Sequence, residues 1–339
     1  MTDKNDTNVE KTSVGGTAIG NPAAGGVGNY RPFSAKAAIQ LASPPTWSAA
    51  LSPVLVGGAA AWALSAFVPF SPDLRALICW VLMLFCALFA QSAVNTLNDY
   101  KDFLAGTDTA ETILDVTDAS IVYNAINPRA ALRFGISLCL LAALTGVVVA
   151  WLSSWWLLLL GALGAAAVVF YSLGPKPLSY LPLGEAVSGL VMGGIITVAT
   201  YIALTQSFAP LILAVSIPAV LTIALIMLTN NSCDIERDIL AGRHTLAVLL
   251  GASGAQRLAT GLAVFTLFWM AVLAFMFWLP ALLPIGVVAL AGYGRLNLIS
   301  RGPYSLENRR QMMGNISLWC LLVNSCWAGG LLICGIIGA

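Results

Sequence analysis

Apolar segments long enough to cross a lipid bilayer recur along almost the whole of this 339-residue chain. A helix needs roughly 20 apolar residues to cross the hydrocarbon core, and it satisfies its own backbone hydrogen bonds there without water. Charged residues make up only 9% of the chain, which is too few to cover a soluble domain, where about 25% is usual. We therefore predict an all-α polytopic membrane protein, a bundle of about nine transmembrane helices. The predicted spans are residues 47–70, 75–97, 130–151, 153–171, 184–205, 209–230, 256–278, 280–299 and 315–337.

The N-terminal segment differs from the rest of the chain. Residues 1–45 are rich in Gly, Ala and Asn and contain no long apolar run. This composition is typical of a disordered tail and lacks the features of a cleaved signal peptide. We predict a disordered tail over residues 1–45 and one membrane domain over residues 46–339.

The distribution of positive charge predicts the orientation of the bundle. If the N-terminal tail lies in the cytoplasm, all of the 16 Lys and Arg residues except Arg75 face the cytoplasm as well, in agreement with the positive-inside rule. The C-terminus then lies outside, and the two longest connections, near residues 98–129 and 231–257, lie inside. We expect the active site on this side of a bacterial cytoplasmic membrane. A net charge of +1 without a basic groove argues against a nucleic-acid partner, and no protein partner is evident.

Three tryptophans lie near the ends of predicted spans, at Trp155, Trp156 and Trp278. Tryptophan rings favour the boundary between lipid and water, because the indole has an apolar body and a polar N–H. We therefore expect all three to anchor the bundle at the membrane surface.

Two polar segments, which we call the first box and the second box, interrupt the apolar pattern directly after predicted spans. The first box covers residues 95–108 (NTLNDYKDFLAGTD), and the second box covers residues 230–248 (NNSCDIERDILAGRHTLAV). Each contains polar side chains four residues apart, such as Asn98 with Asp102 and Asp234 with Asp238. This spacing places the two side chains of a pair on one face of a helix.

The chemistry of the boxes points to a bound cation. Neighbouring carboxylates repel one another unless a cation or a hydrogen-bond donor neutralises them. Oxygen donors suit Mg²⁺, which usually takes one or two carboxylates and completes its shell with water and substrate phosphate. The alternative is that the acids are solvated loop residues that cap helices. The matching spacing and sidedness of the two boxes favour the metal site.

Taken together, the two boxes resemble the UbiA superfamily of intramembrane aromatic prenyltransferases, over roughly residues 45–337. Both boxes, the segment YSLGPKP at residues 171–177 and the following Gly184-Glu185 look like the branch that prenylates 1,4-dihydroxy-2-naphthoate in menaquinone synthesis. The resemblance implies transfer from a polyprenyl diphosphate to an aromatic acceptor, with two Mg²⁺ ions neutralising the pyrophosphate so that the allylic carbon–oxygen bond ionises. Other phenolic acceptors, such as 4-hydroxybenzoate or homogentisate, stay open.

The resemblance also implies a role for each polar residue of the boxes. Asp102 and Asp234 are the first candidates for metal ligands that catalysis requires. Gly106 stands where the superfamily has a third acid, so Asp108 would replace it. Lys176 would bind the diphosphate and act in catalysis, unless it serves only the positive-inside rule. The implied metal ligands are Asn98, Asp99, Asp102, Asp108, Asn230, Asp234 and Asp238, and the implied diphosphate contacts are Lys176, Arg243, Tyr171, Lys101 and Arg129.

A secondary transporter is the competing interpretation, because many apolar helices with polar breaks also suit transport. Transporters usually place their binding groups near the middle of the bilayer. Here the acids lie at one face of the predicted bundle, and Glu185, near the start of a span, is the nearest exception. The sequence therefore favours the enzyme.

Overall fold

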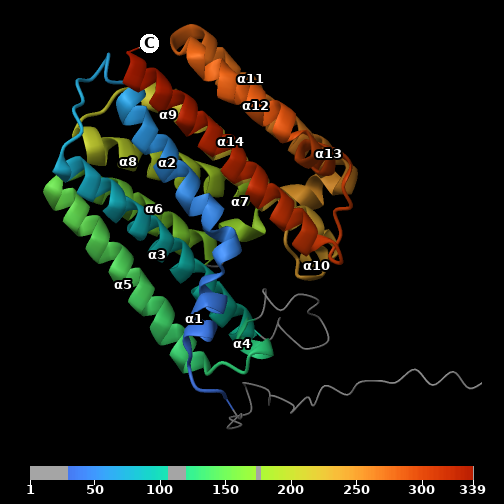
Figure 1. Cartoon of the computed structure of the whole chain (residues 1–339). Coiled ribbons are helices and arrows are strands. Elements are labelled where there is room, and N and C mark those ends of the chain that lie inside the picture. Colours follow the sequence, from blue (N-terminus) through green and yellow to red (C-terminus); the bar gives the residue numbers. More distant parts are fainter. Residues whose placement is uncertain (1–29, 106–119, 173–176, 339) are drawn as a thin grey trace, which may run out of the picture.

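A computed structural model of the protein describes residues 30–105, 120–172 and 177–338. These residues fold into helices gathered in one bundle (Figure 1), and they contain no β-strand. The all-α prediction is confirmed for this part of the chain. Asp108 of the first box and the loop residue Lys176 lie outside the described ranges.

A helical segment coincides with every predicted span. Among the described residues, six segments are long and apolar enough to cross a membrane, and α12 with α13, bent by 55°, makes a seventh if the pair is one span. Helices α2 and α6 are shorter, with 16 and 17 residues. The protein is thus an integral membrane protein that crosses the bilayer several times. The segments are α2 (Ser48–Ala63), α3 (Leu74–Ala105), α5 (Pro128–Leu152), α6 (Trp156–Ser172), α7 (Gly184–Ser188), η4 (Gly189–Ile195), α8 (Ile196–Thr205), α9 (Leu211–Cys233), α11 (Leu246–Phe277), α12 (Leu282–Ala291), α13 (Tyr293–Arg301) and α14 (Arg309–Ile337).

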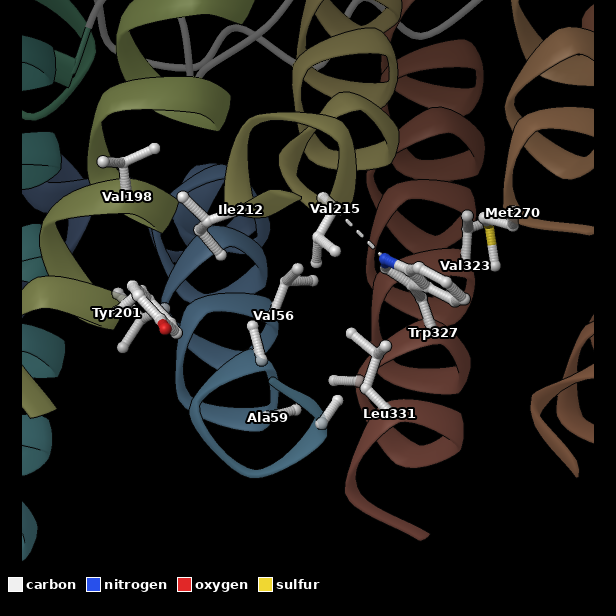
Figure 2. Packing of buried hydrophobic residues seen from close by; sticks show 14 of the residues in the cluster. Val56, Ala59, Val198, Tyr201, Ile212, Val215, Met270, Val323, Trp327 and Leu331 are labelled. Carbon is white, nitrogen blue, oxygen red and sulfur yellow. Dashed lines mark hydrogen bonds between the residues drawn. The ribbon is translucent and has the colours of Figure 1, made fainter. Parts of the chain in front are cut away.

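Helix α2 packs against α14, α8 and α9 and forms the core of the bundle with them. A Cβ atom added at Gly57 of α2 would lie 2.5 Å from the carbonyl oxygen of Thr197, so the two backbones approach where only glycine fits. Figure 2 shows Val56 of α2 among the buried side chains of this core. The indole N–H of Trp327 donates to the carbonyl of Val215 at 3.1 Å, so this polar atom is satisfied away from water.

The prediction for the three tryptophans is wrong for one of them. Trp155 and Trp156 are exposed, as expected of anchors. Trp278 is only 2% exposed. Its indole N–H donates to the carbonyl of Ala63 at 3.2 Å, and its ring meets that of Trp327 edge to face. The turn after α11 folds inward at this point, so a residue near a span end becomes part of the core.

The predicted disordered tail is also too long. Helix α1 (Ala35–Ala42) and the 3₁₀ turn η2 (Pro44–Trp47) occupy the end of the stretch that we expected to be disordered up to residue 45. Leu41 of α1 is buried beside Phe103 of α3 in a small apolar cluster. A few apolar side chains thus suffice to order this segment, because α3 offers them a surface. Residues 1–29 lie outside the described part of the chain.

Both boxes lie at the same end of the bundle (Figure 1). The first box begins in the last turns of α3, and the second box runs from the end of α9 through α10 (Ile235–Leu240), at the end opposite the C-terminus. Arg75 stands at the start of α3, where its guanidinium donates to the carbonyls of Ala203 and Leu204 at 3.1 and 2.7 Å. The boxes and Arg75 therefore lie at opposite ends, as the charge pattern predicts.

Candidate active site

The first box continues the last turns of α3, so its polar residues project from a rigid helix end. Asn95 fastens this end to the N-terminal segment, because its amide donates to the carbonyl of Ala42 at 3.0 Å and to the hydroxyl of Thr46 at 2.8 Å. Asn95 is therefore a structural residue. Four further residues of the box are partly buried and interact with neighbouring groups, namely Asn98, Asp99, Lys101 and Asp102.

The second box begins where α9 ends, and Arg309 holds its first two predicted ligands. Asp234 is the residue between α9 and α10. From the start of α14, the guanidinium of Arg309 donates to the side-chain oxygen of Asn230 at 2.7 Å, and its Nε lies 3.2 Å from Oδ2 of Asp234. The other oxygen of Asp234 lies 3.9 Å from the guanidinium of Arg237. The two predicted ligands are thus held together by a cation from a distant part of the chain.

The side chain of Asp238 holds the turn that follows α10 in place. Its carboxylate lies 3.4 Å from Arg243 and accepts a hydrogen bond from Thr245 at 3.2 Å. Gly242 has a φ of 68°, which glycine adopts without strain, and this lets the backbone N–H of Arg243 donate to the carbonyl of Asp238 at 2.8 Å. Burial raises the pKa of Asp238, and Arg243 opposes the rise. Asp238 therefore stabilises the shape of this loop.

Arg243 brings the two boxes together. Its guanidinium lies over the ring of Tyr180, 5.1 Å from the ring centre. Burial alone would lower the pKa of Arg243, but the negative charges of Asp238 and of Asp102, together with Tyr180, outweigh burial and raise the pKa. Asp102 belongs to the first box and Asp238 to the second. One guanidinium thus lies within electrostatic range of carboxylates of both boxes, which supports their predicted convergence.

The remaining predicted diphosphate contacts differ in their placement. The hydroxyl of Tyr171 donates to the sulfur of Met227 at 3.4 Å, and the phenol lies within electrostatic range of Arg243 and Asp238. Arg129 is exposed at the start of α5, where its backbone N–H is capped by Asn127. Tyr171 therefore lies near Arg243 and Asp238 of the second box. Arg129 lies at the surface, in the first turn of α5.

The donor atoms of the second box fit Mg²⁺. Oδ1 of Asp234 is buried and has no hydrogen-bond partner, although buried oxygens are normally paired. Burial raises the pKa of Asp234 to about 6, and Arg237 opposes the rise. In the described part of the chain, no three His, Cys, Asp or Glu side chains stand close enough to hold a metal by themselves. Mg²⁺ in proteins is usually held by one or two carboxylates, and water and substrate phosphate complete its shell.

Two residues that the sequence pattern did not assign belong to the same region. Glu185 of α7 is buried, and one of its oxygens accepts a hydrogen bond from Asn231 of the second box at 2.9 Å. A lone acid at the start of an apolar span was the signal for it, since such acids are costly in a membrane. Nothing in the sequence marked Arg309 as a site residue, because the positive-inside rule already explains an arginine in that connection.

Comparison with known proteins identifies one family. Residues 50–323 match the model of the UbiA prenyltransferase family. The 1,4-dihydroxy-2-naphthoate octaprenyltransferase of Bacillus subtilis is 36% identical over 219 residues, which cover 65% of this chain and 67% of that protein. The 1,4-dihydroxy-2-naphthoate octaprenyltransferase of Haemophilus influenzae is 31% identical over 306 residues, which cover 87% of this chain and 95% of that protein.

Solved structures share the fold. A UbiA homologue from Archaeoglobus fulgidus, solved with DMAPP and Mg²⁺ bound, superposes with a TM-score of 0.59 over 87% of this chain and 99% of its own, at 17% identity. A UbiA homologue from Aeropyrum pernix superposes with a TM-score of 0.61 over 84% of this chain and 97% of its own, at 18% identity. At these identities the likeness concerns the fold.

Proposed function

This chain belongs to the UbiA prenyltransferase family, and from that premise we propose that it transfers a polyprenyl group from a polyprenyl diphosphate to 1,4-dihydroxy-2-naphthoate, in menaquinone biosynthesis. The observation that carries the proposal is that the two boxes lie at one end of the bundle (Figure 1), where Arg243 lies 3.4 Å from Asp238 and within electrostatic range of Asp102. The acceptor is proposed because curated relatives from two bacteria bear that activity in their names.

The donor diphosphate would lie between the boxes. Asp102 and Asp234 would each provide a carboxylate to Mg²⁺, most simply to two ions, with the amide oxygens of Asn98 and Asn230 beside them. When bound, Mg²⁺ neutralises charge on the leaving pyrophosphate. Arg243 would add a guanidinium that matches phosphate oxygens, and Lys176 a further cation. A homologue of the same fold from Archaeoglobus fulgidus binds DMAPP with Mg²⁺, which supports the use of Mg²⁺ with a prenyl diphosphate.

The bundle would place this chemistry at the cytoplasmic side of a bacterial cytoplasmic membrane. We propose that all of the roughly nine apolar segments cross the bilayer, the short α2 and α6 included, with the N-terminus inside and the C-terminus outside. The apolar helices would hold the isoprenoid tail and keep water from the allylic cation, so that the ring of the acceptor attacks it instead.

The test is transfer by the purified protein in detergent, with labelled polyprenyl diphosphate and a panel of phenolic acceptors. We expect turnover to need Mg²⁺, to stop in excess chelator and to return when Mg²⁺ is restored. Asp102→Ala and Asp234→Ala should each abolish turnover and leave the protein folded, because each removes a metal ligand. Glu307→Ala, at an exposed acid before α14, is the matched control. Full turnover in chelator, or in either Asp variant, would contradict the proposed site.

The acceptor panel also separates the alternatives. Faster transfer to 4-hydroxybenzoate or homogentisate than to 1,4-dihydroxy-2-naphthoate would keep the reaction and change the substrate. A transporter would release no pyrophosphate from a prenyl diphosphate in detergent, where no gradient exists. Metal-dependent release of pyrophosphate, coupled to an alkylated ring, is the outcome that we expect of a prenyltransferase.

A further inference from the structure

Glu185 has a buried carboxylate oxygen that the fold does not use. The residue is 4% exposed. Its Oε1 accepts a hydrogen bond from the amide of Asn231 at 2.9 Å, whereas its Oε2 has no hydrogen-bond partner. Among the described residues, the only other buried carboxylate oxygen in this condition belongs to Asp234 of the second box. Burying a polar oxygen without a hydrogen-bond partner costs free energy, so we expect this oxygen to bind a ligand.

The backbone fixes Glu185 in place. Helix α7 runs directly into the π-helical turn η4, and both pack on α9. A Cβ atom at Gly193 would lie 2.5 Å from the Cα atom of Val220 on α9, so the two backbones are in contact. Asn231, the partner of Glu185, stands on the last turn of α9. Insertions of this π-helical kind are frequent at functional sites. Glu185 is therefore held rigidly beside the second box.

The surroundings of Glu185 are those of the proposed donor site. The hydroxyl of Tyr171 would lie 3.5 Å from a Cβ atom at Gly184, the residue before Glu185. The Tyr171 phenol is within electrostatic range of Glu185, and also of Arg243 and Asp238. Glu185 thus lies beside the groups that would hold the diphosphate, and its hydrogen bond with Asn231 occupies only one of its two oxygens.

We propose that Glu185 binds the phenolic hydroxyl of the aromatic acceptor and takes its proton during transfer; this role rests on the proposed function. The hydroxyl is a donor, and Oε2 of Glu185 is an acceptor to which no described residue donates a hydrogen bond. A positioned carboxylate that removes a proton from the nucleophile is a general base. A phenol with its proton removed places more electron density on the ring carbons that attack the allylic cation.

The atoms balance as follows. The allylic carbon–oxygen bond of the donor breaks, and its electron pair leaves with the pyrophosphate. The hydroxyl proton passes to Oε2 of Glu185, while a ring carbon forms the new bond to the allylic carbon and the hydroxyl oxygen becomes a carbonyl. The alkylated ring carbon then loses its substituent and keeps the bonding electron pair. The substituent leaves as carbon dioxide where the carbon carries a carboxylate, and as a proton taken up by the released pyrophosphate where it carries hydrogen. The aromatic ring reforms, and Glu185 returns the proton to the oxygen.

Glu185→Gln tests this role, because the amide oxygen of Gln can still accept from Asn231 while the side chain can no longer take a proton. We expect kcat/KM for the acceptor to fall by about 10²- to 10⁴-fold, the usual contribution of a general base. The KM for the donor and the affinity for Mg²⁺ should not change. The loss should shrink along a series of acceptors whose hydroxyl groups are increasingly acidic, since an ionised acceptor needs no base. Glu307→Gln is the matched control.

Three outcomes are decisive. If Glu185→Gln keeps the acceptor kcat/KM within about twofold of the wild type, or if the loss is the same for every acceptor acidity, Glu185 only orients Asn231 and the proposal is overturned. If Glu185→Gln does not fold, Glu185→Asp replaces it, and the same dependence on acceptor acidity decides the matter. If the wild type prenylates no phenol, the proposed function fails first and takes this role with it.

Discussion

At the scale of single residues, Arg309 balances the charge of Asp234. The side chain of Asp234 is only 15% exposed and lies 3.2 Å from the guanidinium. We expect Arg309→Gln to lower the free energy of unfolding by about 2 kcal/mol in chelator. The variant loses the ion pair with Asp234 and the hydrogen bond that the guanidinium donates to Asn230 at 2.7 Å, and a hydrogen bond that involves a charged group is typically worth about 1.5–3 kcal/mol. Mg²⁺ should restore more stability to this variant than to the wild type, because the metal replaces the lost cation.

Thermal unfolding in detergent, with and without Mg²⁺, measures both effects. Arg310→Gln makes the same change of charge at the exposed neighbouring residue and serves as the control. Equal shifts in the two variants would show that the contact between Arg309 and Asp234 contributes nothing specific.

The raised pKa of Asp234 also predicts how the affinity for metal changes with pH. Burial raises the pKa of its carboxyl group to about 6, with Arg237 acting in the opposite direction. A metal binds the ionised carboxylate, so the proton competes with Mg²⁺ below this pH. The Kd should rise about tenfold for each pH unit below about 6 and level off above about 7. Without metal, the same raised pKa makes the protein less stable as pH rises from about 4 to about 6, because the folded state holds the proton more tightly.

Binding of Mn²⁺ followed by electron paramagnetic resonance over this pH range measures the competition. Asp234→Asn, which cannot ionise, should bind weakly with a shallower pH dependence. A Kd that stays constant between pH 5 and about 7 in the wild type would exclude Asp234 as a ligand.

At the scale of elements, the contact between η4 and α9 sets the geometry of the site. Gly193 allows the two backbones to meet, because a Cβ atom there would lie 2.5 Å from backbone atoms of Val220. We expect Gly193→Ala to cost about 1–3 kcal/mol of stability through overpacking, and to raise the KM of the acceptor by moving Glu185 relative to Asn231. At Gly194 the nearest atom would be 3.4 Å away, so Gly194→Ala should change stability and KM much less. Thermal unfolding and steady-state kinetics of the two variants compare the positions directly.

At the scale of the whole molecule, the number of spans decides on which side each end of the chain lies. Helix α1 lies at the same end of the bundle as the boxes, and α14 ends at the opposite end (Figure 1). If all of the roughly nine segments cross the membrane, the two ends of the chain face opposite sides. Alkaline phosphatase fused after α14 should then be active in bacterial cells and green fluorescent protein at the same place dark. The reverse result would mean that one segment does not cross.

The sequence by itself determined the class of the fold and the positions of the two boxes along the chain. A run of apolar residues has one stable form in lipid, the helix, so the positions of the helices follow from local composition. The boxes could be recognised because few polar residues occur elsewhere. Their spacing of four predicted shared helix faces, and Asn98 and Asp102 do lie on one helix, α3, whereas Asp234 lies at the break before α10, which contains Asp238. Their placement at one end followed from counting crossings between them.

Only the tertiary structure decided which of these residues meet. The partners of Asp234, Asp238 and Glu185 are Arg309, Arg243 and Asn231, and no local pattern predicts such pairs, because side chains from separate helices meet only after the backbones have packed. Packing also turned Trp278 from an expected anchor into a core residue and ordered α1 against α3. Composition sets what a segment can bury, whereas the neighbours that it finds set what it does bury.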